Sequence, residues 1–328
     1  MWLKKLVLFV WVLILTGSCL TELAYGKDFP TKPIEVIVGH TAGSPLDMVS
    51  RLVGDIAPKY LGQPVVVVDK PGAGGSIAAA EIISSSPDGY KLFTTTNFFF
   101  ATTSKTQTLP FDPYHLVPLV NFVQFTEGIF VRGESPWRTF KEVLDYARAN
   151  PGKLRWAHTG RGIAGHVTVS FIFKKAGVET IEVPYKGSPE KLAALLGGHV
   201  DLSSFTYGAV KDHLKTGNVR ILALISDRRS MHADLSNAPT VIELGFPEIS
   251  KITALVGFYL HKDTPGGIKK TLIDAFKKTY NDPAFKNGIE KTGDEMRFGE
   301  PEFMKEAIMK SEEFTVPMLK ELGLYVGK

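Results

Sequence analysis

The sequence contains one cysteine, Cys19, among 328 residues. A single thiol cannot form a disulfide within the chain, so the fold must be stabilised by its hydrophobic core. Histidine pairs at metal-ligand spacing are also missing, because the eight histidines are scattered along the chain. The motifs G-x-S-x-G and H-E-x-x-H and the lysine of a P-loop do not occur. We therefore expect a protein that is not an enzyme and that uses neither a metal nor a cofactor.

A strong charge of one sign is absent as well. The formal net charge is +4, and the densest basic segment, Arg228-Arg229, is two residues long. This charge is too small and too scattered to indicate nucleic acid as a partner. Hydrophobic residues make up 44% of the chain, which predicts a globular protein with a sizeable core. The length is sufficient for two domains of ordinary size.

The apolar run near the N-terminus is too short to span a bilayer, which takes ~20 residues. Two lysines precede this run, Leu6 to Leu15, and Ala24-Tyr25-Gly26 follows as a small-x-small cleavage site. Residues 1–26 are therefore predicted to be a signal peptide, and the mature protein to be periplasmic. Cys19 could carry a lipid anchor or could be removed with the signal. Thr16 fits the lipid-attachment motif poorly, which favours removal.

Predicted strands at 34–38, 65–68 and 92–96 are separated by segments with helical spacing. This order predicts a parallel sheet with right-handed crossovers. After a long extended segment at 119–131 the same pattern begins again, and a second apolar run at 252–260 could cross back. We therefore expect two α/β domains with a hinge near Gln124 and Thr253. The predicted domains are residues 27–124 together with 253–328, and residues 125–252.

Two predicted loops, 40–47 and 158–166, each follow a strand and open a helix. The amides of such a loop and of the first helical turn lack acceptors and favour an anion. The second loop also contains G-x-G-x-x-G, from Gly160 to Gly165, with Glu182 where a ribose-binding acid would stand. That motif alone would indicate a dinucleotide. Export favours the simpler use of the same geometry, a backbone cradle for a carboxylate.

Several polar and aromatic residues near these loops allow two roles. Asp47 could cap the first helix, hold the preceding loop in shape, or do both. His158 and His166 flank the glycine loop and could contact a ligand or hydrogen-bond the ends of elements. The aromatic run 98–100 could belong to the core, or could line a cleft beyond the end of its strand.

Many short motifs match one family in the same order along the chain. They include Phe29-Pro30-Thr31-Lys32-Pro33-Ile34, Lys70-Pro71-Gly72-Ala73-Gly74-Gly75, Pro87-Asp88-Gly89-Tyr90, Asn150-Pro151-Gly152, Val183-Pro184-Tyr185-Lys186-Gly187-Ser188 and Leu195-Leu196-Gly197-Gly198-His199-Val200-Asp201. With these motifs the chain resembles the periplasmic solute-binding proteins of tripartite tricarboxylate transporters, the Bug or TctC family. The resemblance extends from Phe29 to about Leu324.

The resemblance implies a type II periplasmic binding fold, a clamshell of two doubly wound α/β domains with a ligand cleft between them. It implies a small carboxylate ligand, which in this family includes di- and tricarboxylates, acidic amino acids and aromatic acids. It also implies delivery of that ligand to a membrane permease, and we expect a monomer without nucleic acid. An alternative is a sensor whose closed form is presented to a membrane receptor kinase.

Carried over by position, the resemblance predicts a set of ligand-binding residues from both domains. They are His40, Thr41, Ala42, Gly43, Ser44, Asp47, Asn97, His158, Thr159, Gly160, Arg161, Gly162, His166, Tyr185, Phe205 and Thr206. The sequence departs from the family pattern at three places. Ala42-Gly43-Ser44, followed by Pro45, stands in place of a Pro-Gly-Gly stretch. Phe205-Thr206 replaces an Asp-Asn pair, and Arg161 replaces a small or polar residue.

These departures suggest an aromatic or otherwise hydrophobic carboxylate. Arg161 would pair with the carboxylate, while Phe205 and Phe99 would contact the apolar body of the ligand. The alternative is that Arg161 points to solvent and that Phe205 belongs to the core.

Overall fold

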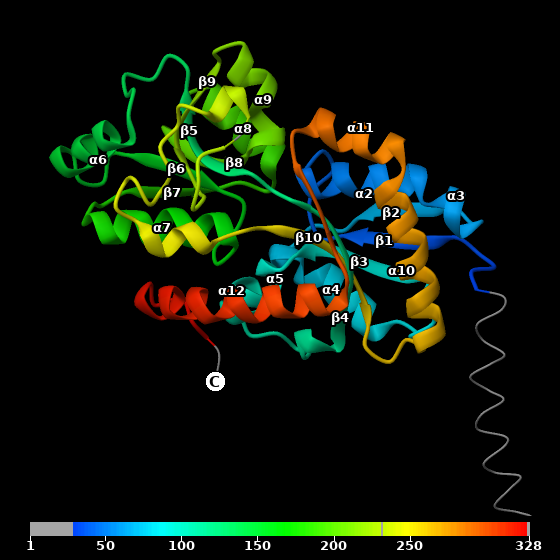
Figure 1. Cartoon of the computed structure of the whole chain (residues 1–328). Coiled ribbons are helices and arrows are strands. Elements are labelled where there is room, and N and C mark those ends of the chain that lie inside the picture. The colour runs from blue at the N-terminus through cyan, green and yellow to red at the C-terminus, as the bar shows by residue number, and fades with distance from the viewer. Residues whose placement is uncertain (1–28, 231, 327–328) are drawn as a thin grey trace, which may run out of the picture.

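Two β-sheets with helices packed against them form two lobes, joined by extended segments that cross between them (Figure 1). The computed structural model describes residues 29–230 and 232–326. The predicted signal peptide and Cys19 lie outside these residues. Within the described ranges no helix is long and apolar enough to cross a bilayer.

The first sheet has six strands in the order β11-β4-β10-β3-β1-β2. β1 pairs in parallel with β2 and with β3, as the alternating pattern predicts, whereas β10, β4 and β11 add antiparallel strands. The strands are β1 (Ile34–Val38), β2 (Val65–Asp69), β3 (Lys91–Thr96), β4 (Leu116–Gln124), β10 (Leu255–His261) and β11 (Glu295–Gly299).

The first lobe also contains most of the helices. They are α2 (Pro45–Ile56), α3 (Pro58–Leu61), α4 (Ser76–Ser84), α5 (Phe98–Ala101), α10 (Gly266–Asn281), α11 (Pro283–Thr292) and α12 (Pro301–Glu321). Short 3-10 turns occur in both lobes: η1 (Ala73–Gly75), η2 (Thr103–Lys105), η3 (Pro113–His115), η4 (Ala233–Leu235) and η5 (Pro247–Lys251).

The second sheet has five strands in the order β7-β6-β8-β5-β9, in which β6 is parallel to β7 and β8. Its strands are β5 (Glu127–Arg132), β6 (Arg155–His158), β7 (Ile181–Pro184), β8 (Leu202–Thr206) and β9 (Val219–Leu224). Its helices are α6 (Phe140–Ala149), α7 (Ala164–Ala176), α8 (Ser188–Leu196) and α9 (Tyr207–Lys215).

Hydrophobic packing covers both faces of the first sheet. Val36 and Ile37 are neighbours in β1 and point to opposite faces, yet both are fully buried and belong to separate core clusters. This double burial explains why the strand reads as an unbroken apolar run. Phe99 is 2% exposed and lies 5.4 Å from Phe93, between ring centroids, in the second of these clusters. The aromatic run 98–100 therefore belongs to the core, and a contact of Phe99 with a ligand is not supported.

The predicted extended segment 119–131 is two strands in different sheets. β4 ends at Gln124 in the first sheet, and β5 begins at Glu127 in the second. The chain returns just before β10, where the Phe125 amide donates to the Ala254 carbonyl at 2.9 Å. The two crossing segments therefore lie side by side, and we propose them as the hinge and the domain boundary.

Candidate functional site

A cavity of about 130 Å³ lies between the two lobes, beyond the carboxyl ends of β1, β3, β6 and β8. A smaller cavity of about 70 Å³ adjoins it, and the two share His40, Ser44, Thr159 and Ser188. The larger cavity has room for a ligand of on the order of ten non-hydrogen atoms. Its lining residues are His40, Ser44, Pro45, Leu46, Thr96, Phe125, Glu127, Thr159, Ile163, Ala164, Gly165, Ser188, Lys191, Ser204, Phe205, Thr206, Ala209 and Ala254.

Four helices begin at this cavity. Leu46 of α2, Gly165 of α7 and Ser188 of α8 are first-turn residues in its wall, and Thr206 precedes α9. The first-turn amides of a helix have no acceptor within the helix, and the helix dipole adds positive potential there. One helix from the first lobe and three from the second thus favour an anion in the same space.

The lobes touch at the edge of the cavity. A Cβ atom added to Gly187 would lie 2.1 Å from Thr41 Oγ1 of the opposite lobe. A Cβ atom at Gly162 would lie 2.1 Å from Thr106 Oγ1. Each contact joins the two lobes. The two predicted loops, which start after β1 and β6, face each other across one gap, because Ser44 of the first and Thr159 of the second line the same cavity.

Asp47 does not cap the first helix. The helix begins at Pro45, and the capping residue is Ser44, whose Oγ accepts from the Asp47 amide at 3.3 Å. Proline suits the first helical position, because no helical acceptor exists there for the amide hydrogen that it lacks. Asp47 holds the loop instead: Oδ2 accepts from the Gly43 amide at 2.8 Å, and Oδ1 lies 2.7 Å from Nε of Arg51.

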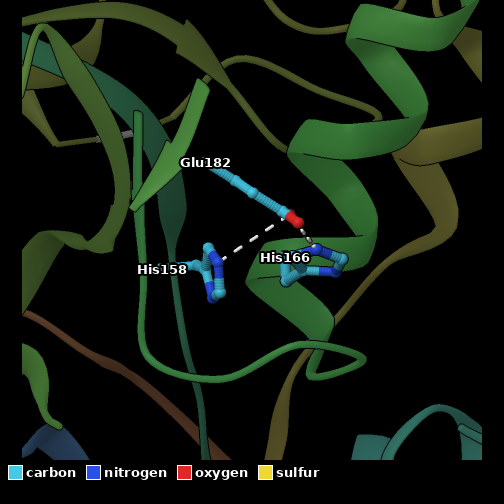
Figure 2. Close-up of side chains that lie close together, drawn as sticks. All are labelled: His158, His166 and Glu182. Carbon is cyan, nitrogen blue, oxygen red and sulfur yellow. Dashed lines mark hydrogen bonds and ion pairs between the residues drawn. The ribbon is translucent and has the colours of Figure 1, made fainter. Parts of the chain in front are cut away.

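The histidines at the second loop bind loop amides. Nδ1 of His158 accepts from the Gly160 amide, and Nδ1 of His166 accepts from the Gly162 amide, both at 3.2 Å. Glu182 lies between the two rings, with Oε2 at 2.7 Å from His166 Nε2 and 3.8 Å from His158 Nε2 (Figure 2). The amides of Gly160 and Gly162 are thus already used, so they do not form the carboxylate cradle that the motif suggested.

His158, His166 and Glu182 are close enough to hold a metal ion by distance alone. Their hydrogen bonds oppose this use. Because each Nδ1 accepts a backbone hydrogen bond, each neutral ring carries its own hydrogen on Nε2, the atom that faces Glu182. A metal on Nε2 would move the hydrogen to Nδ1, where it would oppose a backbone N–H. The cluster is therefore better suited to fixing the loop than to binding a cation.

Arg161 and Phe205 lie in different surroundings. Arg161 is 69% exposed, lies 3.3 Å from Glu182 Oε1, and lines neither cavity. The proposed pairing of Arg161 with a ligand carboxylate is therefore not supported. Phe205 packs against Phe130 in the core, and it also contributes to the cavity wall.

Other predicted residues lie in or near the cavity. Thr159 and Thr206 line it, Thr41 lines the adjoining space, and Ala42 belongs to the same loop. Asn97 does not line it but borders a separate opening together with Gln124 and Glu127. Its side-chain amide donates to Ser311 and Thr253, and its side-chain oxygen accepts from the Leu255 amide. Tyr185 is half-buried and packs against the core of the second lobe, and its backbone amide donates to the His158 carbonyl.

Three buried polar atoms at these cavities have no hydrogen-bond partner among the described residues. They are His40 Nδ1, Thr41 Oγ1 and Thr206 Oγ1. Buried polar groups in native proteins are almost always paired. These atoms are consequently available to a bound molecule.

Two charged residues of the cavity wall, Lys191 and Glu127, escaped sequence reasoning. Lys191 is 7% exposed, and its Nζ donates to the Ser204 carbonyl at 2.5 Å. Burial lowers the pKa of Lys191 to about 8, and burial raises the pKa of Glu127. The sequence does contain a signal for Lys191. Ala194 and Leu195 lie three and four positions later, so helical spacing places Lys191 on the same face of the helix as these two apolar residues, and that face is buried.

Acidification from pH 6.5 to 4 should destabilise the protein through its buried histidines. Burial lowers the pKa of His40 and of His158 to about 4. An unfolded histidine binds its proton near pH 6.5, so in this window the unfolded chain binds more protons than the folded one. Each residue then removes up to roughly 3 kcal/mol of unfolding free energy. Urea unfolding at several pH values measures this loss, and His158→Gln should give a shallower pH dependence. An unchanged dependence in that variant would contradict the argument.

The sequence is similar to one established family. The family model described as "Tripartite tricarboxylate transporter family receptor" matches residues 49–324. A Cupriavidus necator protein, "UPF0065 protein in gbd 5'region", is 36% identical over 269 residues, which cover 82% of this chain and 80% of the relative. BugT of Bordetella pertussis is 28% identical over 250 residues, or 75% of this chain and 76% of BugT.

Solved structures agree with these matches. The periplasmic binding protein BugD superposes with a TM-score of 0.83 at 26% identity, over 90% of this chain and 99% of BugD. The R. palustris protein Rpa4515 with adipate superposes with a TM-score of 0.82 at 26% identity, with the same coverage. The two-lobed fold is thus that of periplasmic binding proteins, as the sequence predicted.

Proposed function

The chain belongs to the tripartite tricarboxylate transporter receptor family, and on that premise we propose that it is a periplasmic solute-binding protein for a small carboxylate. The ligand is captured between the lobes and delivered to the permease of a tripartite tricarboxylate transporter. Such a protein makes and breaks no bond.

One observation carries this proposal: four helices from two lobes begin at a shared cavity that also contains a buried lysine. Helix N-termini and an ammonium group both favour a carboxylate. The unpartnered atoms of His40, Thr41 and Thr206 supply further polar contacts. The description of Rpa4515 with adipate supports the same ligand class.

The cavity wall favours an apolar body between the polar ends of the ligand. Phe125, Ile163 and Phe205 bring apolar side chains to it, together with Ala209 and Ala254. Binding sites for small molecules commonly combine an apolar wall with a few placed polar groups. We therefore propose a carboxylate with a short hydrophobic body, and the size of the cavity limits it to about ten non-hydrogen atoms.

Closure of the lobes is the proposed mechanism. The two crossing segments at Phe125 and Ala254 provide a narrow connection about which the lobes can rotate. A carboxylate that touches helix starts from both lobes binds the closed form more tightly than the open form. That difference in contact sets the shift in population.

Titration of the purified mature protein with small carboxylates tests the proposal. A ligand at a hundred times its dissociation constant should add about 2.7 kcal/mol of stability, visible as a rise in melting temperature. The matched amides of the same acids should give no rise, because they lack the negative charge. If no carboxylate in a broad panel of aliphatic and aromatic acids raises the melting temperature, the proposal fails.

A further inference from the structure

Lys191 and Glu127 face the same cavity with opposite charges, yet no ion pair joins them among the described residues. Lys191 enters from the first turns of α8, and Glu127 is the first residue of β5. Each still senses the charge of the other: the Glu127 carboxylate opposes the fall in the pKa of Lys191, and Lys191 opposes the rise in the pKa of Glu127. They therefore place two opposite charges in the wall of one cavity without forming an ion pair with each other.

The Lys191 ammonium group is only partly satisfied. It has three hydrogens to donate, and one hydrogen bond holds it, to the Ser204 carbonyl. Its Nζ also lies 4.3 Å from the centroid of the Phe205 ring. A buried ammonium group without a counter-charge is costly, so a carboxylate brought by a ligand would be strongly favoured there.

The Glu127 carboxylate is half-buried and accepts no hydrogen bond from any side chain or amide in the described part of the chain. A ligand group that donates hydrogen bonds and carries positive charge would complete it. A second carboxylate on the ligand would instead meet a like charge in a low-dielectric space.

We propose that the cavity is built for a neutral zwitterion, with a carboxylate held by Lys191 and an ammonium group held by Glu127, in preference to a dicarboxylate. This inference rests on the proposed function. The apolar wall and the cavity volume fit an amino acid with a short aliphatic body. A site with one positive and one negative group should thereby prefer a zwitterion, whereas a receptor for dianions such as adipate needs two groups that each favour a carboxylate.

Calorimetric titration with matched acids at neutral pH tests the inference. ε-Aminocaproate, adipate and caproate share one carbon chain and differ only at the far end, while leucine and isocaproate differ only by the amino group. At least one zwitterion should bind about tenfold or more tightly than its matched acids, which corresponds to one added charge-assisted contact.

Two variants assign the contacts. Glu127→Gln should weaken the zwitterion about tenfold and should strengthen adipate, because the opposing charge is removed. Lys191→Met should weaken every carboxylate. Glu302→Gln and Lys270→Met are matched controls at side chains that are 84% and 77% exposed, and they should bind normally. Circular dichroism and thermal unfolding check that each variant folds.

The outcomes separate the inference from the proposed function. If neither ε-aminocaproate nor leucine binds more tightly than its matched acids, the inference is overturned, and the proposed function stands as long as one of the acids binds. If none of these acids, and no other carboxylate, binds, the proposed function fails with it.

Discussion

A valine in place of Gly187 should abolish ligand binding while both lobes stay folded. A Cβ atom there would lie 2.1 Å from Oγ1 and 2.9 Å from Cβ of Thr41, which belongs to the opposite lobe. The backbone of Gly187 is extended, with φ of −162°, so valine causes no backbone strain. Only the approach of the lobes is blocked, and we expect affinity to fall by about a hundredfold or more, because the closed form becomes rare.

Calorimetric titration measures that loss with whichever ligand the panel identifies, and a second substitution identifies its cause. Thr41→Gly removes the atoms that the valine would meet, so binding by the double variant should recover to the level of the Thr41→Gly single variant. Gly266→Val is a matched control, because its added Cβ would have no neighbour within 4 Å. Normal binding by Gly187→Val would mean that ligand capture does not need this contact between the lobes.

Replacing Asp294 by asparagine should stabilise the protein at alkaline pH. Asp294 is 8% exposed; its Oδ2 accepts from Thr292 Oγ1 at 2.8 Å, while Oδ1 has no hydrogen-bond partner among the described residues. Burial raises the pKa of Asp294 to about 7 from an ordinary value of 3.8. Between these two values the folded chain binds more protons than the unfolded one, so stability falls as the pH rises.

The expected gain for Asp294→Asn is roughly 2–4 kcal/mol at pH 8, because the asparagine has no charge to bury. It should shrink toward zero at about pH 3, below the ordinary pKa of 3.8, where the wild-type carboxyl is protonated in both states. Chemical unfolding at the two pH values measures the difference. Asp55→Asn, at an exposed position of α2, should change stability little at either pH. An equal gain at both pH values would show that the carboxylate charge is not the cause.

Much of the fold was predictable from local patterns. The unbroken apolar runs at β1 and β2 reflect strands covered on both faces, and proline and glycine mark the starts and ends of helices. The elements that were not predicted include α5, α9 and β11. α5 is a run of buried aromatic residues that resembles any core segment, α9 begins directly at the end of β8, and β11 is held by pairing with the distant β4. Neither α5 nor β11 has a distinct local period, whereas α9 has apolar residues at helical spacing, Tyr207, Val210 and Leu214, that sequence reasoning passed over.

The candidate site was predicted less completely. Ser44, Thr159 and Thr206 were predicted from their positions after strands, and all three line the cavity. This worked because the carboxyl ends of parallel strands lie at one edge of a sheet. Sequence reasoning assigned the wrong partner to the Gly160 and Gly162 amides, which histidine rings take. Arg161 was chosen for its charge, although Glu182 already pairs with it. A charge that is satisfied within the protein looks the same in sequence as one that is free.

The sequence by itself determined the two-lobed α/β architecture, the family and the positions of the strand–helix loops, because these depend on periodicity and on residues close together in the chain. Only the tertiary structure decided which polar groups remain free for a ligand. Lys191 and Glu127 are 64 residues apart and meet only when two elements of the second lobe reach the same cavity. Whether a charge is paired depends on such distant neighbours, and on the water that folding removes from around it.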